Sequence, residues 1–208
     1  MLPLSLDLAR LRLVLLGGDA ACVSRLRWLE VAGARALSVY AARPSPALVE
    51  AAGARLKPHW PRLDDLRGAH LVFIADVPEP ERSALAALAR EAGAILHVED
   101  EPALTDSHAP AVLRRGALTI AISTAGAAPG AAAEIKQLLA ARIGPEWRER
   151  IEELRALRQR WRRSGADHAT VRRLTAARID RYGWRKDRSM VAANDRGIRS
   201  ETERGGSS

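Results

Sequence analysis

The sequence contains a single cysteine, Cys22, among its 208 residues. One cysteine can form neither an internal disulfide nor a thiolate metal cage, so zinc-finger and dithiol redox proteins are excluded. The low cysteine content also suits the reducing cytoplasm, where we expect the protein to work.

Long hydrophobic runs are missing as well. No stretch approaches the roughly 18 uninterrupted apolar residues that span a bilayer, and Asp7, Arg10 and Arg12 interrupt the apolar N-terminal segment. We therefore expect neither a membrane span nor a signal peptide, and no membrane among the partners. The composition, 47% hydrophobic and 28% charged, is that of a folded soluble protein.

The net charge of +8 is confined to one part of the chain. Residues 1–141 carry 15 Lys/Arg and 15 Asp/Glu, whereas residues 142–208 carry 18 and 10. The C-terminal third therefore either binds an anionic partner or consists of Arg-rich helices with solvated outer faces and a basic tail.

Short apolar runs alternate with helical patterns over the first hundred residues. The predicted strands are 12–16, 36–40, 71–75 and 95–98. The predicted helices are 19–32, a short one that Pro44, Ser45 and Pro46 can open and that runs through Ala52, and 78–92. This alternation predicts an α/β fold with a Rossmann-like, doubly wound parallel sheet.

The pattern changes after an acidic loop at 99–106. Residues 118–123 predict a lone strand, and the Gly/Pro/Ala loop 126–130 leads into a helix that ends near Ile143. Two further helices are expected over 147–161 and 171–182, with a disordered tail from about Lys186.

A glycine turn follows the first predicted strand and opens the first predicted helix. Its sequence is Leu16-Gly17-Gly18-Asp19-Ala20-Ala21, in which Gly18 and Ala21 fit the dinucleotide fingerprint G-x-G-x-x-G/A but Leu16 replaces the first glycine. The turn either binds a pyrophosphate at the helix N-terminus or is a tight turn with no ligand. No carboxylate ends the second strand, where Tyr40-Ala41-Ala42-Arg43 stands, so the sequence rule does not choose between NAD and NADP.

A second group of polar residues, His97-Val98-Glu99-Asp100-Glu101-Pro102, ends the fourth predicted strand. A carboxylate at this edge of a parallel sheet can act as a general base or only cap a loop. His97 and His108 match no metal-ligand spacing together with these acids, so no metal site is expected.

Over residues 2–180 the chain resembles the siroheme synthase N-terminal module family, the precorrin-2 dehydrogenases and sirohydrochlorin ferrochelatases. The resemblance is distributed over several segments: Leu2-Pro3-Leu4, Gly17-Gly18-Asp19, Ala32-Gly33-Ala34-Arg35, Val98-Glu99-Asp100 with Pro102, Pro110, and Ile120-Ala121-Ile122-Ser123-Thr124-Ala125-Gly126 with Pro129.

The resemblance assigns roles to individual residues. Asp100 becomes the catalytic acid–base residue in both oxidation and metal insertion. The residues implied to hold NAD are Gly17, Gly18, Asp19, Ala20, Ala42, Arg43 and Asp76. The residues implied to meet the substrate are Ser123, Thr124, Gly126 and Arg115, with the other arginines of the basic third.

The activity implied is NAD-dependent oxidation of precorrin-2 to sirohydrochlorin, followed by insertion of Fe(II), a substrate ion, to give siroheme. The resemblance further implies a cytoplasmic homodimer with a Rossmann domain (1–109), a dimerisation segment (110–145) and a helical domain (146–185), followed by the basic tail (186–208).

A different reading is a non-catalytic dinucleotide-binding or redox-sensing module whose basic helices contact nucleic acid. It would explain the incomplete fingerprint but would leave Asp100 and the 123–126 loop without a role. The carboxylate-rich tetrapyrrole already accounts for the arginines, so nucleic acid is not the expected partner.

Overall fold

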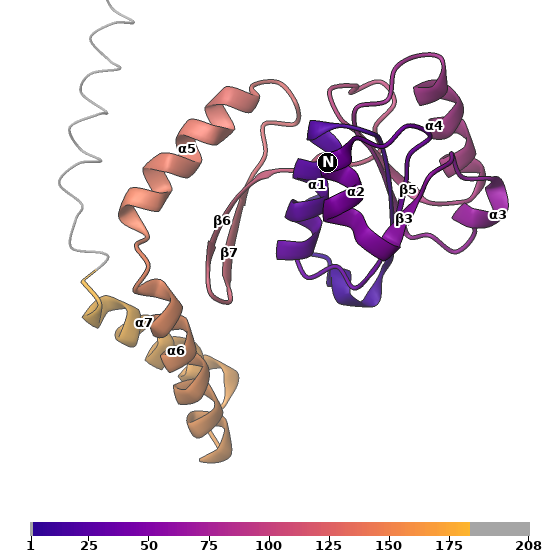
Figure 1. Cartoon of the computed structure of the whole chain (residues 1–208). Helices are drawn as coiled ribbons and strands as arrows, with labels where there is room; N and C mark the ends of the chain where they lie inside the picture. The colour runs from indigo at the N-terminus through magenta and orange to yellow at the C-terminus, as the bar shows by residue number, and fades with distance from the viewer. Residues whose placement is uncertain (1, 184–208) are drawn as a thin grey trace, which may run out of the picture. The chain divides into compact units, whose positions relative to one another are not determined.

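The computed structural model describes residues 2–183 (Figure 1). The chain divides into two compact units. One comprises Met1–Ala111 with Ala121–Lys136, and the other comprises Val112–Ile120 with the chain from Gln137 onward.

The first unit is built on a five-stranded parallel sheet of order β3-β2-β1-β4-β5. Its strands are β1 (Arg12–Leu16), β2 (Ala36–Tyr40), β3 (Leu56–Lys57), β4 (Leu71–Ile74) and β5 (Ile95–Val98). Its helices are α1 (Ala20–Val31), α2 (Pro46–Ala52), α3 (Leu63–Leu66) and α4 (Glu81–Glu91), with short 3-10 turns at Leu8–Arg10 and Gly53–Arg55. This architecture confirms the predicted Rossmann-like fold, and the strand order reverses between β1 and β4.

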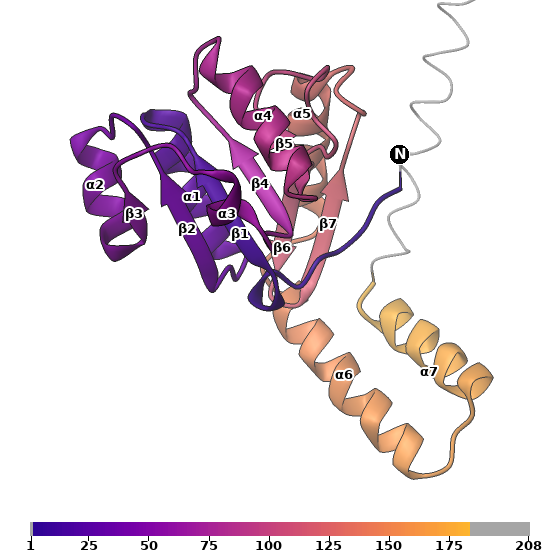
Figure 2. The same ribbon diagram turned by 90° about the vertical axis from the view of Figure 1, so that its right-hand side faces the viewer.

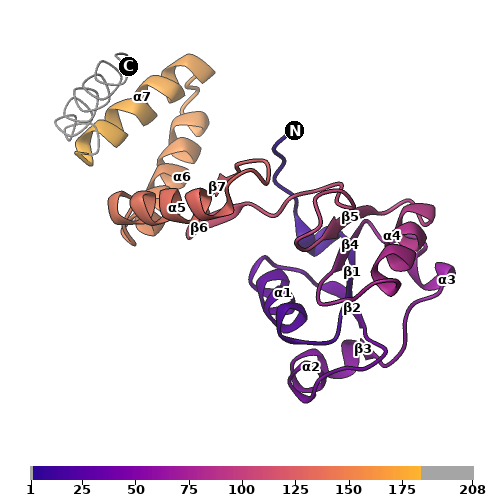
Figure 3. The ribbon, with the colours of Figure 1, turned by 90° about the horizontal axis from the view of Figure 1, so that it is seen from above.

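Both faces of the sheet are covered, because successive side chains of a strand point to opposite sides. Leu13 and Leu15 of β1 pack in one cluster with residues of α1 and α2. Val14 and Leu16 pack in a second cluster with residues of α3 and α4. Figure 3 shows these helix pairs on opposite sides of the strands. Burial on two sides explains why the strands read as unbroken apolar runs.

The sequence missed the two shortest elements of this unit. β3 has two residues and α3 has four, so neither is long enough to show a hydrophobic period. The predicted helix over 78–92 begins later, at Glu81, because Pro80 occupies its N-cap position.

The second unit contains most of a β-hairpin, the C-terminal part of one helix and two complete helices. The hairpin strands are β6 (Ala111–Arg115) and β7 (Leu118–Ile122), and the helices are α5 (Pro129–Arg142), α6 (Trp147–Arg163) and α7 (His168–Arg181). The prediction of a lone strand is wrong, because β6 pairs with β7. Two residues join them, a connection that requires antiparallel neighbours, and Gly116 takes the left-handed turn position at φ +60°. The two arginines that end β6 hid this strand from the apolar pattern.

Helices α6 and α7 lie side by side (Figure 2). Glu153 of α6 bonds Arg178 of α7 and accepts a hydrogen bond from the hydroxyl of Tyr182 at 2.5 Å. Hydrogen bonds from Tyr182 and Arg178 lower the pKa of Glu153. At the start of α6, Trp147 is buried with Leu113 and Ile143 in a small core.

The four-part domain division predicted from the sequence stays a prediction, and its basic tail, 186–208, lies outside the described residues. None of the helices in residues 2–183 is both long and apolar enough to cross a membrane.

We predict that Glu153→Gln lowers the melting temperature of the second unit by a few degrees at pH 7. A lowered pKa in the folded state gives stability that is present above the ordinary pKa of 4.5 and is lost as the pH falls through the folded value. The gap between wild type and variant should therefore shrink in acid, which thermal melts at pH 7 and pH 3 measure. Glu152→Gln is the matched control, because Glu152 is an exposed neighbour that pairs with Arg155 of its own helix.

Candidate functional site

The turn between β1 and α1 passes very close to two other loops of the sheet. A Cβ atom on Gly17 would lie 1.9 Å from the carbonyl oxygen of Ala75, and one on Gly18 would lie 2.9 Å from that of Arg43. Only glycine permits such approaches. The loops that meet here follow β1, β2 and β4, at the carboxyl edge where open α/β sheets bind ligands.

Leu16, which replaces the first fingerprint glycine, is a strand residue with no exposed surface. The N–H of Gly17 still donates to the carbonyl of Tyr40 at 3.1 Å, so the turn begins only after Leu16. The substitution therefore adds a side chain to the core and leaves the turn itself unobstructed.

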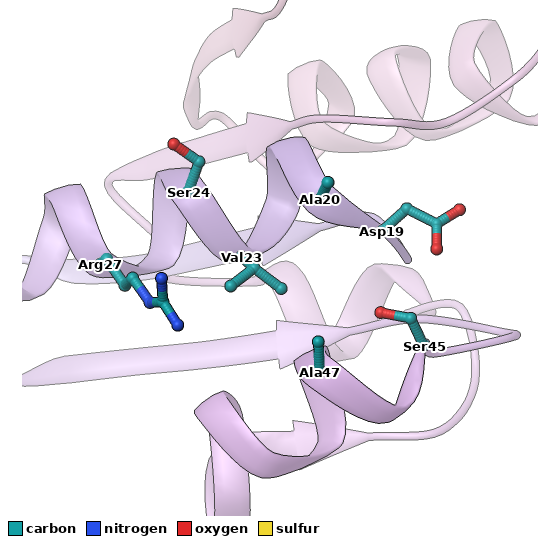
Figure 4. Close-up of a pocket in the computed structure, with 7 residues that line it drawn as sticks. All are labelled: Asp19, Ala20, Val23, Ser24, Arg27, Ser45 and Ala47. Carbon is teal, nitrogen blue, oxygen red and sulfur yellow. The ribbon is translucent and has the colours of Figure 1, made fainter.

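A groove runs from this turn between α1 and α2 (Figure 4). Its lining residues are Asp19, Ala20, Val23, Ser24, Arg27, Ser45 and Ala47. The N–H of Ser45 donates to the carbonyl of Gly18 at 2.9 Å and ties the start of α2 to the glycine turn. Ala42 and Arg43 are exposed in the loop between β2 and α2.

The N-terminus of α1 is capped from a distance. Asp19 occupies the N-cap position without a side-chain hydrogen bond. Instead, Asp76 from the loop after β4 accepts hydrogen bonds from the N–H groups of Ala21 at 2.5 Å and Cys22 at 3.1 Å. Asp76 is one of the predicted cofactor residues, and the structure brings it to the same helix end as Gly18 and Ala20.

A second pocket, of about 550 Å³, lies where β5 ends. Asp100, Ser123, Thr124 and Gly126 all line it, although they come from segments more than twenty residues apart. The volume is within the range of small-molecule sites. The structure thus brings together the predicted acid and the predicted substrate loop, whose individual roles stay predictions.

The three acids that follow β5 differ in their partners. Glu99 pairs with Arg25 at 2.5 Å, and Glu101 pairs with Arg82 at 2.8 Å. Within residues 2–183, the Asp100 carboxylate has neither a cation nor a hydrogen-bond donor, and its backbone is left-handed at φ +58°. An aspartate that capped the loop would accept a backbone N–H, so the contacts do not support the capping role.

The Arg25–Glu99 pair was not foreseen, because 74 positions separate its members. Their side chains are only 15% and 22% exposed. The guanidinium also lies 5.1 Å from the ring centre of Trp28 and 5.9 Å from that of Phe73, favourable cation–π distances. This contact anchors the residue next to Asp100 to helix α1.

His97 and His108 also line this pocket. Nδ1 of His97 lies 2.7 Å from the carbonyl oxygen of Ser107, so it carries the proton and donates it. Burial lowers the pKa of His97, which is therefore neutral at pH 7. In residues 2–183 no group of three His, Cys, Asp or Glu side chains is arranged to hold a metal ion.

Arg115, predicted to meet the substrate, lies in the second unit. Its guanidinium donates to the carbonyls of Ile143 at 2.7 Å, Ala140 at 3.3 Å and Arg114 at 3.1 Å. The bonds to Ala140 and Ile143 satisfy carbonyl groups at the end of α5, a position where a cation is favourable.

Two family models match the chain. One, described as putative NAD(P)-binding, covers residues 4–111, and the other, described as sirohaem biosynthesis protein central, covers residues 115–142. The first contains the glycine turn, Asp76 and Asp100, so the unit that carries both pockets is an NAD(P)-binding domain.

Curated relatives point the same way. The chain is 32% identical over 180 residues to a siroheme synthase of Methylococcus capsulatus, covering 78% of this chain and 38% of that protein. It is 33% identical over 144 residues to one from Gluconobacter oxydans, covering 65% of this chain and 30% of that protein. The chain thus spans well under half the length of these relatives.

A solved structure titled SirC, precorrin-2 dehydrogenase, superposes with a TM-score of 0.68 at 21% identity, covering 97% of this chain and all of that one. At this identity the match shows that the fold is shared.

We predict that Cys22 is unreactive in the folded protein. Burial, reinforced by the charges of Asp76, Glu99 and Asp19, raises its pKa from 9.0 to about 12, and only a thiolate attacks thiol reagents efficiently. Native protein at pH 8 should therefore label far more slowly than protein unfolded in urea, with Cys22→Ser as the blank. Because the folded pKa is raised, stability should also fall as the pH rises above 9. Equal labelling rates in the native and unfolded states would contradict this environment.

Proposed function

Because the chain belongs to the siroheme synthase N-terminal module family, we propose that it catalyses the NAD-dependent oxidation of precorrin-2 to sirohydrochlorin in the cytoplasm. The observation that carries the proposal is the Asp100 carboxylate in the pocket at the end of β5, which no cation or donor among residues 2–183 meets. Arginines stabilise the charged forms of its neighbours Glu99 and Glu101, so Asp100 is the better proton acceptor of the three acids.

The glycine turn fits the cofactor. Gly17 and Gly18 leave no room for a Cβ atom, which lets their backbone approach a phosphate chain. Gly18, Asp19 and Ala20 would hold the pyrophosphate, and Ala42 and Arg43 would border the adenosine half. When bound, NAD accepts the hydride that leaves the substrate.

Asp100 would accept the proton that leaves with the hydride. A carboxylate at hydrogen-bond reach of the proton suits this role, and the Arg25–Glu99 pair holds the adjacent residue in place. The turn that contains Ser123 and Thr124 borders the same pocket and is itself folded. Ser123 accepts the N–H of Ala125 at 3.2 Å, and Thr124 accepts that of Ala128 at 3.2 Å.

We also propose that the protein inserts iron into sirohydrochlorin. The same Asp100 carboxylate would take pyrrole protons as Fe(II), the substrate ion, enters sirohydrochlorin to give siroheme. The substrate's carboxylates would pair with exposed arginines of the basic C-terminal third, and with Arg115 as far as its carbonyl contacts permit.

We further propose that the protein acts as a homodimer and predict a sedimentation mass twice the 22.6 kDa of one chain. Helix α5 leaves Ile135 42% and Leu138 67% exposed, an apolar face that a second copy would cover. Leu138→Glu should shift the mass towards the monomer in sedimentation at micromolar concentration. A wild-type protein that sediments as a monomer would refute the dimer.

We predict that Asp100→Asn lowers the rate of sirohydrochlorin formation by roughly 10²-fold or more, because it removes the base and keeps the shape. The melting temperature should hardly change, since the carboxylate has no partner in the described part of the chain and asparagine tolerates a left-handed backbone. The assay follows sirohydrochlorin absorbance after precorrin-2 and NAD are mixed with the enzyme, and Fe(II) is added afterwards to test siroheme formation.

Glu101→Gln is the matched control. Glu101 lies next to Asp100 and carries the same charge, but its carboxylate already pairs with Arg82. The variant should retain most of the turnover. A wild-type chain that binds NAD but never oxidises precorrin-2 would instead favour the non-catalytic dinucleotide-binding module.

A further inference from the structure

Asp76 occupies the place where a Rossmann domain attracts an anion. Its carboxylate accepts hydrogen bonds from two N–H groups in the first turn of α1, those of Ala21 at 2.5 Å and Cys22 at 3.1 Å. The free N–H groups and the helix dipole at this end are what make such a turn favourable for phosphate. In this chain they already face a negative charge.

The position of Asp76 in the sheet is equally specific. Leu16 of β1 pairs with Ile74 of β4, and the strand order reverses between these two strands. Asp76 stands two residues beyond Ile74 and reaches the helix that follows β1. A carboxylate therefore bridges the switch point, the crevice across which dinucleotides bind in this fold.

Helix α1 does not need Asp76 as its cap, because a favoured capping residue already stands at its own N-cap position. Asp19 stands at the N-cap position of α1, where aspartate is a favoured capping residue, yet its side chain makes no cap hydrogen bond. Asp76 does the capping instead, from a left-handed backbone at φ +57° that costs energy for any residue with a Cβ atom.

A second carboxylate adds to the charge of Asp76, whereas Arg27 supplies a positive charge further along the groove. Asp19 lies at the same helix end, and Arg25, the cation of this helix nearest the second pocket, is already paired with Glu99. The pKa of the Cys22 thiol reflects these negative charges. Burial raises it most, and Asp76, Glu99 and Asp19 each raise it further.

We propose that Asp76 is an internal competitor of the cofactor's phosphate chain and sets the dinucleotide affinity of this protein. The inference rests on the dinucleotide binding of the proposed function and reverses the expected role of Asp76 as a favourable cofactor contact. A pyrophosphate that approaches α1 meets like-charge repulsion and must share or displace two hydrogen bonds. The cofactor site of this chain is therefore a weak one, because Asp76 occupies part of it.

The experiment compares wild type with Asp76→Asn and Asp76→Gly by calorimetry, with NAD and ADP-ribose as the ligands. Asparagine tolerates the left-handed backbone and removes only the charge, whereas glycine removes the whole competing group. We expect both ligands to bind about tenfold more tightly to Asp76→Asn, about 1.4 kcal/mol, and at least as tightly to Asp76→Gly. The gain should shrink as salt is raised, because Asp76 is exposed.

Glu79→Gln is the matched control. Glu79 belongs to the same loop after β4 and also caps a helix, accepting the N–H of Ser83 at 3.2 Å at the start of α4. It should leave the nucleotide affinity unchanged. The melting temperature gives an independent readout, since Asp76→Asn should lower it by about 2–4 °C as α1 loses an anion at its N-terminus.

The outcomes separate the two claims. If wild type binds NAD and Asp76→Asn binds it equally or more weakly, Asp76 is not a competitor, and the proposed function stands without it. If Glu79→Gln gains as much affinity as Asp76→Asn, the gain comes from the lower overall negative charge and not from the position of Asp76. The proposal is then again wrong. If neither wild type nor the Asp76 variants bind NAD or ADP-ribose at millimolar concentration, the dinucleotide binding itself fails and the competitor role with it.

Discussion

The close approach of the β1–α1 turn to the loops after β2 and β4 is the constraint on which the rest of the first unit depends. Gly17 lies against the carbonyl of Ala75 and Gly18 against that of Arg43, with no space for a side chain at either point. This contact fixes where α1 begins and brings Asp76 within reach of its first turn. The same helix carries Arg25, which holds Glu99 beside Asp100, so the turn indirectly positions both pockets.

Neighbouring strands of the sheet end in the same way. Ile74 of β4 pairs with Val98 of β5, and each is followed two residues later by an aspartate with a left-handed backbone, Asp76 and Asp100. Aspartate tolerates this conformation better than most residues with a Cβ atom. The two carboxylates differ only in their partners, because Asp76 meets helix N–H groups and Asp100 meets none in the described chain. The same backbone geometry thus underlies both proposed roles, Asp76 as a competitor of the cofactor and Asp100 as a proton acceptor.

The sequence predicted the sheet well because its central strands are buried on both faces and therefore read as apolar runs. It failed where elements are too short for a period, as in β3 and α3, or mix apolar residues with arginine, as in β6. The pocket around Asp100 could be anticipated from the rule that ligands lie at the carboxyl ends of parallel strands. The contacts of Arg25 and Asp76 could not, since they join residues 74 and 55 positions apart and depend on how α1 packs.

The basic character of the C-terminal third has a structural part as well as a functional one. Arg178 is bonded to Glu153, and Arg150 lies 5.4 Å from the ring centre of Trp147 and 5.0 Å from that of Tyr182, so these two cations help to join α6 to α7. Other arginines of these helices, such as Arg158 and Arg172, are exposed. The net charge of +8 already counts Glu153 against Arg178, so this pairing leaves the excess unchanged and only reduces the number of arginines that face an anionic ligand. The carboxylates of the proposed tetrapyrrole substrate would meet the exposed arginines of these helices rather than the ones held within the helix pair.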